Sequence, residues 1–124
     1  MTMKQSKAPA EVVRDFQSAV SRGEMAGARQ LLADDLHFKG PIDEFHRADD
    51  YVAALGRLAK IVKGMENVRQ FTEGSMVAVF YDLVTNTPAG TSPTAEIYTV
   101  REGKITALQA IFDARPFAAM FGKG

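Results

Sequence analysis

The spacing of apolar residues changes along this chain, from a helical period in the first half to strict alternation in the second half. After a polar tail over residues 1–8, which we expect to be flexible, Pro9 suits the first turn of a helix. Apolar residues then follow at helical spacing. They are Val12, Val13, Phe16, Ala19 and Val20. Gly23 is placed to cap this first helix at its C-terminal end.

Two more helices are predicted before the period changes. The elements after Gly23 are a helix over about 25–33, a strand over 36–38 and a loop over 40–47. The third helix begins at Asp49 or Asp50, and Gly64 stops it. Its apolar face consists of Tyr51, Val52, Leu55, Leu58, Ala59 and Val62.

From Met65 onward, apolar and polar residues alternate as they do in strands. Strands are predicted over about 66–73, 75–85, 94–101 and 104–112. Thr85 to Pro93 forms a polar surface loop, and Glu102-Gly103 forms a tight turn because glycine takes positive φ without steric cost. A short helix closes the chain. This order predicts one α+β domain over 9–124, a curved antiparallel sheet with three N-terminal helices on one face.

Both faces of the predicted sheet are apolar. Strand 75–85 places Val77, Val79, Tyr81 and Leu83 on one side, and Met76, Ala78 and Phe80 on the other. Strand 104–112 divides into Leu108, Ala110 and Phe112 against Ile105, Ala107 and Ile111. A single layer of helices covers one face, so we expect a second copy of the chain to cover the other, in a homodimer packed through the sheets.

Composition narrows the class of protein. The 124 residues carry 15 basic and 15 acidic side chains, a net charge of zero, with no basic cluster to hold a nucleic acid. The absence of cysteine excludes disulfides, thiolate metal sites and cysteine nucleophiles. No apolar run is long enough for a signal peptide or a membrane span, so we expect a soluble cytoplasmic protein without a membrane partner.

Two segments carry a resemblance to a known family. They are GEMAGARQLLADD at 23–35 and EGKITALQAIFD at 102–113, in the element order given above. The chain resembles the NTF2-like superfamily over about residues 9–121, and within it the SnoaL-like branch, near ketosteroid isomerases, limonene-epoxide hydrolases and polyketide cyclases. The resemblance implies a cone-shaped α+β barrel that encloses an apolar pocket. Fold alone does not give a function.

The resemblance also locates the positions where this family places its chemistry. The isomerase base falls on Gly40, which cannot transfer a proton, and the isomerase tyrosine falls on Phe16, which donates no hydrogen bond. The second oxyanion donor falls on Glu96, so one acid is present. The carboxylate that cyclases and epoxide hydrolases place on the last strand falls on Ala110. The catalytic residues of the isomerases and those of the epoxide hydrolases are therefore both incomplete in this chain.

Glu96 is the first candidate for a catalytic residue, with Tyr98 and Tyr81 beside it. Alternation puts Glu96 on one face with Tyr98, and the resemblance turns that face toward the pocket. Desolvation in an apolar pocket raises the pKa of a carboxyl group, which suits a general acid or a neutral hydrogen-bond donor. In the alternative interpretation, Glu96 is near a strand edge and is solvated or pairs with a surface lysine. The two tyrosines would then be packing residues without a catalytic role.

The remaining polar candidates have structural explanations. His37 and His46 bracket a loop that contains Asp43 and Glu44, but their spacing matches no metal motif, and both histidines suit a surface role better than catalysis. Asp113 is placed to cap the final helix. We expect no metal and no cofactor. The predicted pocket wall, which is equally an ordinary core, consists of Phe16, Phe38, Leu55, Leu58, Val79, Leu83, Val100, Leu108 and Phe112.

Three functions are consistent with these candidates. The first is a cofactor-independent isomerase, cyclase or hydrolase that acts on a small hydrophobic molecule bearing oxygen, with Glu96 as the acid–base group. The second is a non-catalytic ligand-binding or dimeric assembly module of the same fold. A third is a protein-interaction domain whose sheet face binds a different chain. Burial of polar groups costs free energy, and a purely structural interior has no need of a glutamate and two tyrosines. Their presence therefore favours the enzyme.

Overall fold

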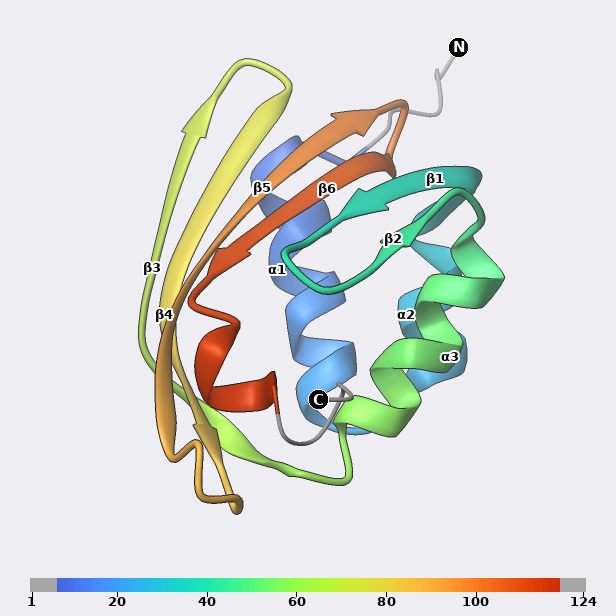
Figure 1. The fold of residues 1–124 in the computed structure, drawn as a ribbon. Helices are drawn as coiled ribbons and strands as arrows, with labels where there is room; N and C mark the ends of the chain where they lie inside the picture. The colour runs from blue at the N-terminus through green and yellow to red at the C-terminus, as the bar shows by residue number, and fades with distance from the viewer. Residues whose placement is uncertain (1–6, 119–124) are drawn as a thin grey trace, which may run out of the picture.

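Three helices lie in the first half of the chain in the computed structural model, which describes residues 7–118 (Figure 1). α1 spans Pro9–Ser21, α2 spans Met25–Gln30 and α3 spans Ala48–Leu58. Gly23 has a φ of 75°, as the predicted cap of α1 requires. Most of the tail predicted to be flexible lies outside the described residues, but Lys7 is described and forms an ion pair with Asp15 at 2.5 Å.

Six strands form one curved sheet. They are β1 (Leu32–Lys39), β2 (Glu44–Phe45), β3 (Val62–Glu73), β4 (Met76–Thr85), β5 (Thr91–Arg101) and β6 (Lys104–Phe112), in the order β2-β1-β6-β5-β4-β3. β1 runs parallel to β6 and every other neighbouring pair is antiparallel, so the sheet is mixed and not purely antiparallel as predicted. The pairing with β1 satisfies the backbone groups along an edge of β6 that would otherwise be open.

The sheet bends around α1 without closing, while α2 and α3 lie beside β1 (Figure 1). This is the α+β architecture that the sequence predicts, and it tapers like a cone. Irregularities in the ladders support the bend, because a bulge increases local twist. In β3, Asn67 adopts a φ of 56° where the register with β4 shifts. A short 3-10 helix, η1 (Arg115–Phe117), follows β6, and the rest of the predicted closing helix lies outside the described residues.

Several predicted boundaries were wrong because long-range pairing overrides local pattern. α2 ends at Gln30, since Leu32 already pairs with Ile105 of β6. The third helix does not run to Gly64, since the chain pairs with β4 from Val62 onward. β5 starts at Thr91, inside the predicted loop, and β2 was missed altogether. The bounds of β6 match the prediction, and the turn before it has both residues at positive φ.

The predicted alternation holds along β4, where Val77 and Val79 are fully buried while Met76 and Phe80 are 48% and 42% exposed. It fails at Ile105, which was predicted to face outward and is fully buried with Leu108. A register shift between β5 and β6 reverses the direction of this side chain. No helix within residues 7–118 has the length and apolar character needed to cross a membrane.

Candidate functional site

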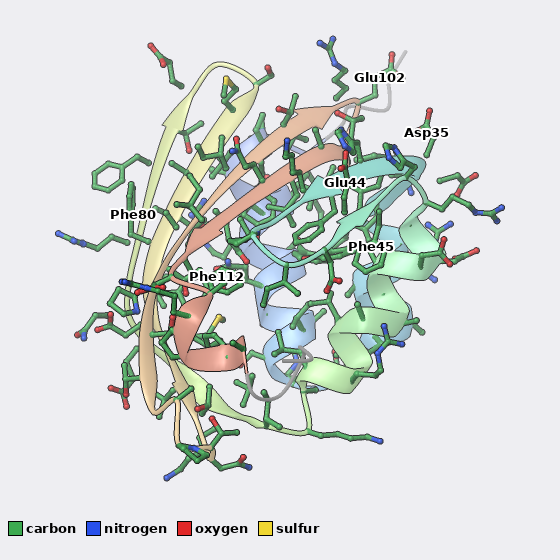
Figure 2. The ribbon with its side chains drawn as sticks, viewed as in Figure 1. Asp35, Glu44, Phe45, Phe80, Glu102 and Phe112 are labelled. Carbon is green, nitrogen blue, oxygen red and sulfur yellow. The ribbon has the colours of Figure 1, made fainter. Side chains whose placement is uncertain are left out.

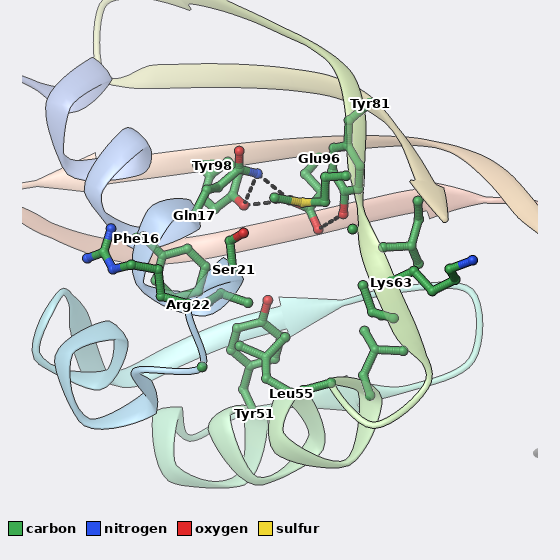
Figure 3. Close-up of a pocket in the computed structure, with 18 residues that line it drawn as sticks. Phe16, Gln17, Ser21, Arg22, Tyr51, Leu55, Lys63, Tyr81, Glu96 and Tyr98 are labelled. Atoms are coloured by element: carbon green, nitrogen blue, oxygen red, sulfur yellow. Dashed lines mark hydrogen bonds between the residues drawn. The ribbon is translucent and has the colours of Figure 1, made fainter. Parts of the chain in front are cut away.

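A network of four polar side chains lies inside the curve of the sheet, centred on Glu96 of β5 (Figure 3). The Tyr98 hydroxyl donates to Glu96 Oε1 at 2.5 Å, and the Tyr81 hydroxyl donates to Oε2 at 3.0 Å. Gln17 Nε2 donates to Glu96 Oε1 and to the Tyr98 hydroxyl oxygen, both at 3.1 Å. The carboxyl group therefore accepts three hydrogen bonds from three different elements.

Local geometry explains how these side chains meet. Glu96 and Tyr98 are two residues apart in β5 and so share its inner face. Tyr81 of β4 pairs with the residue two before Glu96, which places it one diagonal step from the carboxyl. Gln17 follows Phe16 on α1, on the side of that helix that packs against the sheet, and only 9% of its surface is exposed.

The charge state of Glu96 is set by opposing effects. Desolvation raises the pKa of the Glu96 carboxyl above its ordinary value, while the hydrogen bonds from Tyr98, Tyr81 and Gln17 act in the opposite direction. Burial, followed by the neighbouring charge of Glu96, raises the pKa of both tyrosines. The tyrosines are thus neutral donors, and Glu96 holds its proton to higher pH than an exposed glutamate.

Tyr51 of α3 is a fifth polar group in this region. Its ring stacks on Phe38 at a centroid distance of 4.6 Å and on Phe16 at 6.5 Å. Its hydroxyl points toward the inner face of the sheet (Figure 3) and has no hydrogen-bond partner among the described residues. Burial and the charge of Glu96 raise the pKa of Tyr51, so this hydroxyl is a neutral donor available to a ligand.

Two adjoining cavities open onto the network. The smaller, about 370 Å³, lies between α1, α3 and the start of β3, and the larger, about 540 Å³, lies between the β1–β2 hairpin, α3 and β6. Their shared lining residues are Tyr51, Leu55, Leu58, Tyr81, Leu83 and Glu96. Because Glu96 and two tyrosines line both cavities, they stand where a molecule in either one would meet them.

The residues predicted for the pocket wall divide into two groups. Those that line a cavity are Phe16, Phe38, Leu55, Leu58, Leu83 and Phe112. Val79, Val100 and Leu108 were also predicted, but they line neither cavity and are at most 4% exposed. They lie in the closely packed core, where the sheet has no space beside it.

Gln17 and Tyr51 are members of the site that were not predicted from the sequence. Gln17 is a polar residue beside an apolar stripe, and Tyr51 is on the predicted apolar face of the third helix. A polar group on or beside an apolar helix face could have indicated that these residues belong to a site. Their spacing in the sequence did not show which side chains they would contact.

The two family positions that lack an acid, Gly40 and Ala110, lie close together at the larger cavity. A Cβ on Gly40 would lie 3.7 Å from the Ala110 Cβ and 3.0 Å from the ring of Phe38. Ala110 pairs directly with Glu96 in the β5–β6 ladder. Glu96 is therefore next to Ala110, and the ring of Phe38 occupies the space where a side chain at Gly40 would lie.

All but one of the other candidates lie outside the two cavities. Asp113 accepts the backbone N–H of Arg115 at 3.0 Å, at the start of η1, and pairs with its guanidinium, which lowers the pKa of Asp113 to about 2. Asp113 thus bonds the first residue of η1, but the N-cap position is Ala114 and not Asp113 as predicted. His37 and His46 are exposed on the hairpin, as predicted. Asp43 lines the larger cavity, and Glu44 contacts both histidines.

Comparisons with known proteins identify the family. The sequence profile of the SnoaL-like domain matches residues 13–108, so the chain belongs to the SnoaL-like family. The search of curated proteins finds no match.

Solved structures share the fold along nearly the whole chain. An NTF2-like protein of unknown function from Cytophaga hutchinsonii is 25% identical, with 93% of this chain and 98% of that one covered and a TM-score of 0.79. A protein of Xanthomonas campestris described as a proposed polyketide cyclase is 16% identical, with 92% and 96% covered and a TM-score of 0.76. An LEH-like epoxide hydrolase from M. tuberculosis is 19% identical, with 91% and 88% covered and a TM-score of 0.72. The last two likenesses concern the fold alone.

Proposed function

We propose that this protein binds a small, largely apolar molecule bearing oxygen and acts on it by cofactor-independent acid–base chemistry, as an isomerase, cyclase or hydrolase. The observation that carries this proposal is the Glu96 carboxyl, held by three hydrogen bonds at the junction of two apolar cavities. Cavities of several hundred Å³ with a few convergent polar groups are typical of small-molecule sites.

The geometry favours Glu96 Oε2 as the atom that exchanges a proton with the substrate. Oε1 already accepts hydrogen bonds from Tyr98 and Gln17, whereas among the described residues Oε2 accepts one, from Tyr81. A free lone pair on Oε2 can take a proton from a carbon acid or from a water molecule and return it to another position. The pKa of this carboxyl is raised toward neutral pH. A general acid or base is most efficient when its pKa lies near the pH at which the enzyme works.

Tyr51 would act on the oxygen of the substrate. Its hydroxyl is unpaired within the described structure and lines both cavities. A neutral donor in a desolvated site stabilises negative charge that develops on a carbonyl or epoxide oxygen. Gln17 and Tyr98 would hold the Glu96 carboxyl in one orientation, as positioning residues.

The alternative function is a non-catalytic binding module with the same cavities. It is favoured by Gly40, Phe16 and Ala110, which occupy three positions where relatives of this fold carry an acid or a donor. In that case Glu96 and the tyrosines would only recognise the polar end of a ligand, and no bond would change.

A substrate panel with matched variants separates the two functions. Cyclic enones, β-keto esters and epoxides would be incubated with the wild type, Glu96→Gln and the control Glu66→Gln, which alters an exposed acid on β3. Loss of general acid–base catalysis should lower turnover in Glu96→Gln by about 100-fold or more, with Glu66→Gln unchanged. Circular dichroism would establish that each variant is folded. Equal turnover in Glu96→Gln contradicts the catalytic role, while binding without turnover in the wild type supports the alternative.

We also propose that the protein acts as a cytoplasmic homodimer. The outer sheet face exposes large apolar side chains, namely Phe71, Met76, Phe80 and Ile111. Figure 2 shows Phe80 projecting away from the helices. The net charge of zero adds no repulsion between copies, and a self-complementary face is what a two-fold dimer requires.

A further inference from the structure

The outer side of the β1–β2 hairpin gathers both histidines of the chain around one glutamate. His37 lies in β1, Glu44 in β2, and His46 directly after β2. His37 Nε2 is 2.7 Å from Glu44 Oε2, and His46 Nε2 is 3.6 Å from the same oxygen. One ligand atom from each of the three residues lies within 4.8 Å of the other two.

The two imidazole rings are arranged in parallel. Their centroids are 4.7 Å apart and their planes differ by 9°. A simple ion pair with Glu44 would need one histidine, whereas here both Nε2 atoms turn toward a single carboxylate oxygen. All three groups are partly exposed, so a water molecule can approach them, with side chains 48%, 46% and 73% exposed for His37, Glu44 and His46.

We propose that His37, Glu44 and His46 form a binding site for a divalent transition metal such as Zn²⁺. Two imidazole nitrogens and one carboxylate oxygen are ligands that Zn²⁺ uses, with water completing the tetrahedron. Ligand atoms at about 2.0–2.2 Å from a tetrahedral metal lie about 3.3 Å apart. The distance of 3.6 Å between His46 and Glu44 is near this value, and the distance of 2.7 Å between His37 and Glu44 reaches it by a small side-chain rotation.

The hairpin supplies a rigid base for these ligands. The Gly40 N–H donates to the Asp43 carbonyl at 2.8 Å and closes the turn. On the opposite side of the hairpin, Phe38 contacts Phe45 at a centroid distance of 5.8 Å and stacks on Tyr51 of α3. The backbone positions of the three ligands are thus fixed by packing, and a bound metal would need few additional constraints.

Spacing along the sequence did not indicate this site because the hairpin register creates it. Lys39 pairs with Glu44 and Phe38 with Phe45, so His37 and Glu44 project from the same side of the hairpin. Asp43, which lies beside Glu44 in the sequence, is not part of the cluster. Lys39 lies on the same side and attracts Glu44, so its charge opposes a bound cation.

Zinc titration of the tag-free chain tests the proposal. The chain has two histidines and no cysteine, so competing sites for Zn²⁺ are few. After treatment with a chelator, isothermal titration with ZnCl₂ should give one ion per chain. His37→Ala, His46→Ala and Glu44→Gln should each weaken the affinity by at least about tenfold, because loss of a ligand costs no less than loss of a supporting contact. Glu73→Gln, an exposed acid at the far end of β3, should bind as the wild type does.

Two further measurements separate a metal site from a hydrogen-bonded cluster. Zn²⁺ should shift the imidazole NMR signals of both histidines together, and Lys39→Met should bind the ion more tightly. Circular dichroism would establish that the variants are folded. If the wild type binds Zn²⁺ no more tightly than the double variant His37→Ala/His46→Ala, the proposal is wrong. This outcome is independent of turnover at Glu96, so the two proposals stand or fall separately.

Discussion

The two faces of β4 and β5 are made by alternate residues of the same strands, yet they have opposite chemical characters. On the inner face, Val77 and Val79 are fully buried, and Tyr81 and Tyr98 donate hydrogen bonds to Glu96. On the outer face, Phe80 is 42% exposed, and its ring packs edge-on against that of Phe71 with a centroid distance of 5.9 Å. The concave side therefore combines a packed core with satisfied polar groups, whereas the convex side is apolar and uncovered.

This contrast indicates different roles for the two faces of the curved sheet. The inner face stabilises the chain, and the outer face is suited to contact with another molecule. The curvature encloses the inner side, where burial raises the pKa of Glu96. Hydrogen bonds to this carboxyl are stronger there than in water, because the local dielectric constant is low. The outer side encloses nothing, so its aromatic residues add little to the stability of one chain. Their exposure is instead suited to association.

The largest difference between the faces should be in stability. Val79→Asp places a carboxylate in the fully buried core, and an unpaired buried charge costs several kcal/mol, enough to unfold many domains. Phe80→Asp, one residue away on the exposed face, should change the unfolding free energy of a single chain by less than about 1 kcal/mol. Urea denaturation at low protein concentration measures both. Similar losses in the two variants would show that the outer face is as closely packed as the inner one.

The next effect concerns assembly. If the outer face forms the homodimer, Phe80→Asp should convert the dimer to a monomer, because a buried unpaired charge at an aromatic anchor costs about 2 kcal/mol or more of binding free energy. Phe80→Leu keeps the side chain apolar and should leave the dimer intact. Analytical ultracentrifugation measures the mass of each variant. A wild-type chain that is monomeric at high concentration would contradict the dimer.

The smallest effect is a pH dependence of opposite sign for two carboxylates. The pKa of Glu96 in the folded chain is raised above 4.5, so the protein binds this proton more tightly than the unfolded chain. The stability that Glu96 contributes is therefore present below its unfolded pKa and is lost as pH rises through the folded pKa. Against Glu96→Gln, the wild type should become relatively less stable over that range.

Asp113 should show the reverse. Pairing with Arg115 lowers its pKa from 3.8 to about 2, so its contribution is present above 3.8 and is lost as pH falls toward 2. The effect is small because the pair is exposed to solvent. Urea denaturation as a function of pH, with Asp113→Asn as the matched variant, measures the two slopes. Slopes of the same sign would mean that Glu96 is solvated in the folded protein.

Local features of the sequence determined the fold class and the direction of many side chains. Alternation with period 2 fixed which residues of β4 face the helices, and Glu102-Gly103 fixed the turn between β5 and β6. These predictions succeeded because neighbouring residues of a strand or turn decide them. Alternation also predicted that Glu96 and Tyr98 share one face of their strand, whereas the family resemblance predicted that this face turns inward.

Tertiary structure alone decided which groups meet. Gln17 reaches Glu96 across 79 positions of sequence, and the parallel pairing of β1 with β6 also joins segments that are far apart along the chain. The register shift that buries Ile105 and the hairpin register that unites His37 with Glu44 are further examples. Spacing along one segment does not specify such contacts, because they depend on how separate elements pack and on the register in which their strands pair.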